Sequence, residues 1–245
     1  MKKVNPLVGC LAIAFLLYVI TNLWYIWVPI ALVVVAFVIF VSNRATKASK
    51  AEIKALATGL PPASGYVVFD LETTGLYPEE GNRIVQIAII TLDSNLSEVG
   101  RFQAILNPGR DVGPTEIHGI TNAMVRFKPT FKALASELKE VFEGRTVIAH
   151  NVEFDVGFLL NEFAITSPQI IAPTFKKIDT LELAREYLVD SPNHKLGTVV
   201  NHLKIDITNS PGRGSHDALT DTWYCWQILL KIIQLNKLDV GKLSY

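Results

Sequence analysis

Cysteine is scarce in this chain, with two residues among 245, and histidine is nearly as scarce, with five. Cys10 lies in an apolar run and Cys225 in a helix-like stretch, so we expect no disulfide between them and a reducing compartment. The few cysteines and histidines form no cluster with the spacing of zinc ligands. The composition therefore excludes a disulfide-stapled domain and a zinc module built on cysteine.

A net charge is also lacking, because 23 basic and 23 acidic residues give a formal charge of zero at pH 7. The two signs are distributed unevenly: residues 1–60 contain six basic residues and one acidic, whereas residues 61–245 contain 17 basic and 22 acidic. Non-specific affinity for duplex DNA comes mostly from lysine and arginine. The acidic balance of residues 61–245 therefore argues against a broad duplex-binding surface.

Charged residues are missing altogether from residues 7–41. As a single helix this run would be about 52 Å long, against a hydrocarbon core of roughly 30 Å. Thr21–Asn22 interrupts the run, and Pro29 suits the first turn of a second helix. We therefore predict a two-helix transmembrane hairpin, roughly residues 6–21 and 27–42.

Positive charge flanks this run on both sides, beginning with Lys2 and Lys3. Positive charge at both ends indicates that both ends are cytoplasmic, which requires an even number of crossings. We therefore expect a multi-pass protein of the cell (inner) membrane that contacts the lipid bilayer through residues 6–42 and has its remaining domain in the cytoplasm. A cleaved signal peptide and a single tilted span are the alternatives. The hairpin is either a passive anchor or a docking site for a membrane-protein partner.

Three parts are predicted along the chain: a hairpin over 1–43, a basic juxtamembrane helix and linker over 44–64, and a folded domain over 65–245. The basic residues of the second part recur on one helix face, which suits a membrane surface or a solvated flank. The third part has a three-stranded meander followed by alternating helices and short strands, which predicts an α/β fold with a mixed sheet flanked by helices. The expected strands are 65–72, 83–93, 98–108, 145–150 and 175–180, and the expected helices are 129–144, 151–164, 181–188, 195–205 and 215–236.

Two carboxylates stand side by side in VVFDLETTGL, residues 67–76. Strand side chains alternate between faces, so Asp70 and Glu72 point the same way, where they repel each other and lose hydration. Two residues this close on one strand cannot flank a sugar linkage from opposite sides, which excludes a glycosidase. His216 and Asp221 begin the last expected helix, in SHDALTDTW.

A further acid, Asp155, is the polar residue of a largely apolar turn in AHNVEFDVGFLL. Asn151 is expected to cap the helix that contains Asp155, and Glu153 and Glu162 are expected to be exposed. Taken singly, Asp155 and the acids of the last helix are equally consistent with exposed helix positions. Converging carboxylates, however, require divalent cations, and oxygen ligands point to two magnesium or manganese ions. Such a pair of ions is the usual apparatus for phosphodiester cleavage.

The segments FDLETTGL, AHNVEFDVGFL and HDALTDT occur in this order and resemble the three exonuclease motifs of the DEDDh family. The nearest patterns are those of the epsilon proofreading subunit of bacterial DNA polymerase III and of ribonuclease T. EIHGITNAMV and IDTLELAREYL also resemble stretches of epsilon-like domains. The resemblance covers about residues 65–235 and implies a ribonuclease H-like exonuclease fold that releases nucleoside 5′-monophosphates from a 3′ end.

The resemblance also implies a role for each matching residue. Asp70 would bridge both metals, and Glu72 and Asp221 would complete the site that holds the attacking water. Asp155 would support the second metal, and His216 would be the general base. The residues implied for substrate binding are Thr73, Thr74, Gly75, Leu76, His118, Phe154 and Phe158. The family spacing of four residues after the histidine selects Asp221 rather than Asp217, which is expected to favour the helix N-terminus.

These observations predict a membrane-anchored, metal-dependent 3′–5′ exonuclease acting on single-stranded ends of DNA or RNA. One alternative is a non-catalytic nucleic-acid or nucleotide-binding module at the membrane. The presence of all five acidic and histidine positions argues against it, because an inert relative usually loses a ligand. A polymerase-associated proofreading subunit is the other alternative.

Overall fold

A computed structural model describes residues 65–212 and 217–245 and, of the preceding part, only residues 11, 13–15, 17, 18, 28, 29 and 32–35, which are helical. The chain divides into two units, Met1–Lys50 and Ala51–Tyr245. Most of the predicted hairpin over 6–42 and all of the predicted basic segment over 44–64 lie outside the described residues. Within the described part, no helix is long and apolar enough to cross a membrane.

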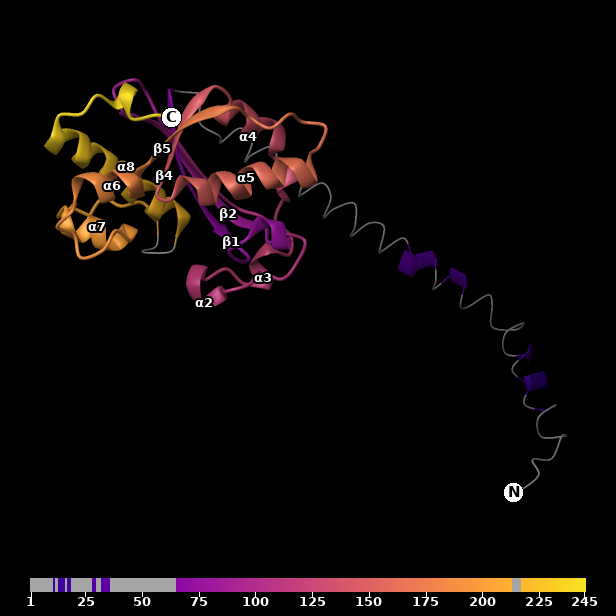
Figure 1. The fold of residues 1–245 in the computed structure, drawn as a ribbon. Helices are drawn as coiled ribbons and strands as arrows, with labels where there is room; N and C mark the ends of the chain where they lie inside the picture. The colour runs from indigo at the N-terminus through magenta and orange to yellow at the C-terminus, as the bar shows by residue number, and fades with distance from the viewer. Residues whose placement is uncertain are drawn as a thin grey trace. The chain divides into compact units, whose positions relative to one another are not determined.

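One five-stranded mixed sheet forms the centre of the second unit, with the strand order β3-β2-β1-β4-β5 (Figure 1). Strands β1 to β3 form an antiparallel meander, and β4 and β5 run parallel to β1. The carboxyl ends of β1, β4 and β5 therefore meet at one edge of the sheet. The predicted mixed sheet is confirmed, and its strands are β1 (Tyr66–Thr73), β2 (Ile84–Leu92), β3 (Glu98–Ile105), β4 (Arg145–Ala149) and β5 (Phe175–Asp179).

Helices cover both faces of this sheet (Figure 1). One face packs against α4 (Ala135–Phe142) and α5 (Val152–Thr166). The other packs against α6 (Thr180–Tyr187), α7 (Leu196–His202) and α8 (Ala218–Asn236). Each face buries an apolar cluster, and this two-sided burial explains why β2 is buried along its whole length.

The alternation of side chains along β1 distributes its residues between the two faces. Val67, Phe69 and Leu71 belong to the core under α4 and α5, whereas Val68 belongs to the core under α6, α7 and α8. Asp70 and Glu72 follow Val68 at steps of two, so they point to the face that α8 covers. Local strand geometry thus places both acids beside the last helix.

Short helical elements complete the domain. They are η1 (Pro78–Glu80), α2 (Thr115–His118), α3 (Asn122–Val125), η2 (Phe131–Ala133) and η3 (Val240–Lys242). The segment that contains α2 and α3 contributes to a small cluster of Val85, Val112, Ile120 and Val125 beside β2 and β3. The sequence predicts neither helix, because a single turn carries no measurable helical periodicity.

Glu162 of α5 corrects an expectation from the sequence. It was expected to be exposed, but only 1% of its surface is accessible. Its carboxylate accepts hydrogen bonds from Arg83 Nε and Nη2 at 2.7 and 2.9 Å and from the Ile84 backbone N–H at 3.2 Å. The pair therefore joins the start of β2 to the C-terminal third of α5, across a sequence separation that no local pattern reveals.

Candidate active site

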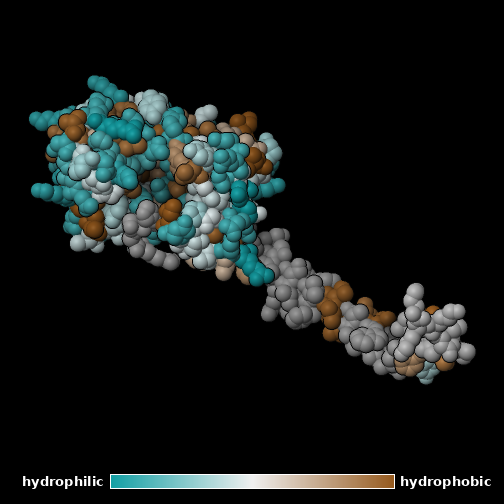
Figure 2. Space-filling view, turned by 60° about the horizontal axis from the view of Figure 1, so that its bottom comes forward, coloured by the Kyte–Doolittle hydropathy of each residue, from teal (hydrophilic) through white to brown (hydrophobic). Residues whose placement is uncertain are grey.

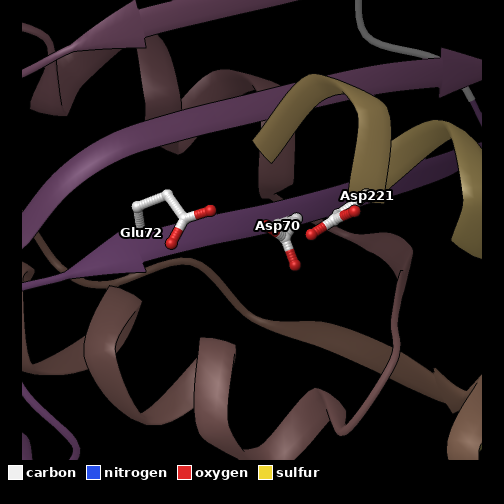
Figure 3. Close-up of side chains that lie close together, drawn as sticks. All are labelled: Asp70, Glu72 and Asp221. Carbon is white, nitrogen blue, oxygen red and sulfur yellow. The ribbon is translucent and has the colours of Figure 1, made fainter. Parts of the chain in front are cut away.

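Three carboxylates converge where β1 ends (Figure 3). Asp70 and Glu72 come from β1 and Asp221 comes from the first turn of α8. One carboxylate oxygen of each lies within 4.8 Å of the others. In Figure 3 the carboxylates of Asp70 and Asp221 lie next to each other, and that of Glu72 lies further along the same strand. This spacing suits oxygen ligands that share one hard divalent cation.

The electrostatics of this cluster also indicate a cation. Burial, followed by the charges of Asp155, Asp221, Glu72 and Asp217, raises the pKa of Asp70 well above its ordinary value. Burial, followed by the charges of Asp221 and Asp217, raises the pKa of Glu72 to about 8. Within the described residues, no lysine or arginine forms an ion pair with either acid of β1. The donor set therefore fits divalent metal ions, which would neutralise the repulsion.

Asp155 reaches the cluster from the opposite side of β1. It lies in the first turn of α5, is 3% exposed, and accepts a hydrogen bond from the Leu71 backbone N–H at 3.1 Å. Burial raises the pKa of its carboxyl, although the bond from Leu71 opposes this shift. The structure thus places Asp155 beside the backbone between Asp70 and Glu72, but not within the triad that shares one 4.8 Å sphere.

Asp179, which is not among the site residues predicted from the sequence, fixes the helix that contains Asp155. Its carboxylate accepts backbone N–H groups from Asn151 at 2.9 Å, from Val152 at 3.1 Å and from Leu181 at 2.8 Å. The prediction that Asn151 caps α5 with its own side chain is wrong, because Asn151 adopts a left-handed backbone with φ of 81° and makes no such bond. An aspartate two residues before the predicted helix LELAREYL, residues 181–188, was the signal for a cap.

The start of α8 is held on the sheet by side chains of β2 and β3. Asp217 caps the helix by accepting the Leu219 backbone N–H at 3.4 Å, and it also accepts a bond from Gln103 Nε2. The Ala218 backbone N–H donates to Gln86 Oε1 at 3.2 Å. The expectation that Asp217 serves the helix N-terminus is confirmed. His216 lies outside the described residues, so its role as general base stays a prediction.

A cavity of about 490 Å³ adjoins the cluster on the β2–β3 side. Its lining includes Gln86 and Asp217 beside the acids, and Ile117 and Met124 from α2 and α3. His118 also lines it, with Nε2 donating to the Val112 carbonyl at 3.2 Å and Nδ1 accepting the Ile120 N–H at 3.0 Å. Both ring nitrogens are thus engaged, so His118 serves as a fixed wall. Polar and apolar surfaces are mixed across this domain, as Figure 2 shows.

The predicted TTGL segment is held rigidly after β1. Thr73 donates its hydroxyl to the Gly75 carbonyl at 2.7 Å, and the hydroxyl of Thr74 accepts the Arg83 N–H at 3.0 Å. Gly113 lies against the same segment, where a Cβ atom would approach the Thr74 carbonyl oxygen to 2.3 Å. Leu76 stands out, with 67% of its surface exposed. The segment therefore presents one apolar side chain on a fixed backbone.

The two phenylalanines of α5 differ from each other. Phe154 is partly buried and packs against the core, with its ring 5.0 Å from that of Phe158. Phe158 is 0% exposed and lies in the core between α5 and the sheet. The prediction that Phe158 binds substrate is therefore wrong, because a fully buried ring offers no face to a base. Phe154 stays a candidate.

Sequence comparisons agree with this site. The RNase_T family, described as exonuclease, matches residues 67–229. DNA polymerase III subunit epsilon of Rickettsia prowazekii (strain Madrid E) is 34% identical over 161 residues, covering 63% of this chain and 68% of that protein. The 3′-5′ exonuclease DinG of Bacillus subtilis (strain 168) is 32% identical over 172 residues, covering 69% of this chain. The chain spans only 18% of DinG and 24% of an epsilon-like protein of Rhodobacter capsulatus.

Solved structures share the fold. Exonuclease X in complex with 5′ overhanging duplex DNA has a TM-score of 0.58 at 23% identity, covering 73% of this chain and 96% of that one. The nuclease domain of 3′hExo, a DEDDh family member bound to rAMP, has a TM-score of 0.54 at 20% identity, covering 69% and 91%. The ribonuclease H-like exonuclease fold that the motifs implied is therefore confirmed.

Proposed function

The chain belongs to the RNase_T exonuclease family and carries the domain of a 3′–5′ exonuclease, and we propose that it releases nucleoside 5′-monophosphates from single-stranded 3′ ends. The observation that carries this proposal is the triad of Asp70, Glu72 and Asp221 within 4.8 Å. Unlike a structural carboxylate pair, the three carboxylates are partly buried, repel one another, and are bordered by a cavity of about 490 Å³. Such a site suits metal-assisted hydrolysis.

Each residue of the site would have a distinct task. Asp70, Glu72 and Asp221 would hold a divalent cation, and Asp155 would support a second. Such ions supply Lewis acidity to the attacking water and to the leaving oxygen. His216 would accept the proton of that water. The 490 Å³ cavity beside the triad would receive the terminal nucleoside, with Leu76 against its base.

The preference for single-stranded ends rests on two supports. Residues 61–245 carry more acidic than basic residues, which disfavours a broad duplex contact. One structural neighbour, Exonuclease I, is described in complex with a dT13 oligonucleotide, which is a single strand. Exonuclease X is described with 5′ overhanging duplex DNA, whose 3′ end is paired, and therefore does not add to this support. Because 3′hExo is described with bound rAMP, RNA is the competing polymer.

Anchoring in the cell (inner) membrane is a separate part of the proposal. Its supports are the uncharged run over residues 7–41 and the basic residues on both sides of it. A two-helix hairpin with both ends cytoplasmic would place the exonuclease domain in the cytoplasm. Fractionation of the full chain tests this: recovery in the membrane fraction after a high-salt or carbonate wash supports the anchor, and release by either wash contradicts it.

Proofreading beside a polymerase is the second candidate. It is favoured by 34% identity to a DNA polymerase III epsilon subunit over 68% of that protein. A proofreading enzyme would remove a mismatched 3′ terminus from a primed template much faster than a paired one. Equal rates on both termini, with faster digestion of the free strand, would favour the first proposal.

The deciding experiment gives the full chain a 5′-labelled DNA strand and an RNA strand of the same sequence. Reactions contain magnesium, manganese or a chelator, with Asp70→Asn as the inactive variant and the exposed Asp190→Asn as its matched control. We expect a ladder that shortens from the 3′ end, lost with chelator and with Asp70→Asn but retained by the control. Binding without cleavage of either polymer, in folded metal-loaded protein, would favour the non-catalytic module.

A further inference from the structure

A second cavity, of about 300 Å³, lies outside the acid triad. Its chemistry is opposite to that of the triad, because its lining contains basic and amide side chains and no carboxylate. The lining residues are His150, Leu181, Arg185, Asn193, His194 and Lys195. A cavity of this composition is suited to an anionic ligand.

Strand register places this cavity on the same face and edge of the sheet as the triad. Val68 of β1 pairs with Ile148 of β4 in parallel register, and both belong to the core under α6, α7 and α8. Two residues further along, Asp70 and His150 therefore point to that same face. Since neighbouring strands lie about 4.8 Å apart, the second cavity begins one strand away from the acids.

The first cavity lies on the other side of the triad. Gln86, which lines it, is the direct cross-strand partner of Glu72, and the lining also contains Gln103 of β3. The order across the open edge is therefore first cavity, acid triad, second cavity. Consider a polynucleotide with its terminal nucleoside in the first cavity and its scissile phosphate at the triad. The nucleotides on the 5′ side of that phosphate then reach the second cavity.

The side chains of the second cavity divide into a fixed wall and an accessible basic rim. His150 forms the wall, with Nε2 2.8 Å from the His194 carbonyl oxygen and Nδ1 3.0 Å from Thr180 Oγ1. Lys195 is exposed and makes no ion pair with any described residue. Arg185 is exposed and pairs with the exposed Glu182, a kind of surface pair that gives little stability and that a phosphate replaces readily.

We infer that this cavity binds the phosphate backbone of the substrate strand, one or more nucleotides 5′ of the scissile bond, through Lys195 and Arg185. The inference rests on the proposed function. Its physical reason is that the acidic balance of residues 61–245 disfavours contact with a polyanion, so a localised basic contact helps to hold the strand.

The test compares two substrates of the full chain. One is the p-nitrophenyl ester of thymidine 5′-monophosphate, which contains only the terminal nucleotide, and the other is an oligothymidylate long enough to pass the second cavity. We expect Lys195→Ala to raise KM for the oligonucleotide by about tenfold and to leave kcat and the ester reaction unchanged. Arg185→Ala should act in the same direction but less, since its charge is shared with Glu182.

A matched control and a salt titration sharpen this result. Lys132→Ala removes an exposed lysine from η2, which packs with α5 on the opposite face of the sheet, and should change neither substrate. Lys195 contributes no side-chain cap to α7, so its alanine variant should retain the wild-type melting temperature. The slope of log KM against log salt for the oligonucleotide should fall by about 0.7 in Lys195→Ala.

The outcomes separate the inference from the function on which it rests. If wild type and Lys195→Ala have equal KM for the oligonucleotide, or if the ester reaction falls as far as the oligonucleotide reaction, the inference is wrong while the exonuclease remains. If wild type hydrolyses neither substrate, the proposed function fails. In that case the binding of a fluorescent oligothymidylate, measured by anisotropy, tests the inference without catalysis. Equal Kd for wild type and Lys195→Ala overturns the inference, and a tenfold higher Kd in the variant supports it.

Discussion

Carboxylates that are buried or partly buried occur in two regions of this domain, and their charges are balanced in opposite ways. Glu162 accepts two hydrogen bonds from Arg83 and one from the backbone, so the fold itself neutralises its charge. Asp70 and Glu72 face other acids, and their pKa values are raised by burial and by those neighbouring charges. A buried carboxylate with a cationic partner is part of the scaffold, whereas partly buried carboxylates that face one another indicate a place for metal ions.

The largest expected effect is the loss of exonuclease activity when an acid of the triad is replaced. Asp70→Asn keeps the shape of the side chain but removes a charge that the ions require. We expect the exonuclease rate to fall by about 10³-fold or more, measured with saturating magnesium on the labelled strand. The melting temperature of the metal-free protein should stay the same or rise, since one repulsive charge is gone. Retained activity in this variant would remove the triad from the reaction.

Changes to the Arg83–Glu162 pair should reduce stability and leave the exonuclease activity intact. Arg83→Ala leaves the carboxylate of Glu162 buried without its cation, and we expect a loss of about 3 to 5 kcal/mol in the free energy of unfolding. Urea denaturation measures this loss, and the rate per folded molecule should stay near wild type. Replacing both partners, Arg83→Met with Glu162→Leu, should recover part of the stability. A double variant less stable than Arg83→Ala would contradict this account of the pair.

Asp179 combines the two behaviours, because it supports the scaffold and thereby positions Asp155. We expect Asp179→Ala to reduce the free energy of unfolding by about 2 kcal/mol, through the loss of three backbone hydrogen bonds. It should also weaken activation by the metal, raising the magnesium concentration for half-maximal rate more than KM for the oligonucleotide. Asp179→Asn, which retains one acceptor oxygen, is the control. Its free energy of unfolding and its magnesium requirement should lie between those of wild type and Asp179→Ala. An unchanged metal requirement would limit Asp179 to a structural role.

The smallest expected effect is a pH dependence of stability that metal ions reverse. A carboxyl with a higher pKa in the folded than in the unfolded chain binds more protons when folded, so the free energy of unfolding falls as pH rises between the two values. For Glu72 this range runs from 4.5 to about 8. We expect the metal-free protein to melt on the order of 5 °C lower at the upper end than at the lower end.

Magnesium should reduce that difference, because it binds the ionised triad of the folded state. Calorimetric scans of the full chain at several pH values, with chelator and with magnesium, measure both effects. Glu72→Gln should flatten the metal-free profile. A metal-free profile that rises with pH would contradict the direction of the pKa shifts.

Much of the fold and part of the site follow from local sequence patterns. The order of strands and helices is readable because alternation and helical spacing act over a few residues. The same alternation put Asp70 and Glu72 on one face of β1, and the position of Asp221 at a helix start put it where α8 meets the sheet. The one-turn helices α2 and α3 are not predicted from the sequence, because four residues are too few to show a helical period.

The sequence by itself determined the family, the acidic character of the site and its preference for hard cations, because these depend on residue type and near neighbours. Only the tertiary structure decided which polar groups are satisfied. Glu162 has a partner 79 positions away, and Asp179 caps a helix that starts 27 positions before it. Phe158 was buried by packing between α5 and the sheet. Such pairings depend on how separate helices and strands pack against one another, and short-range sequence patterns do not predict that packing.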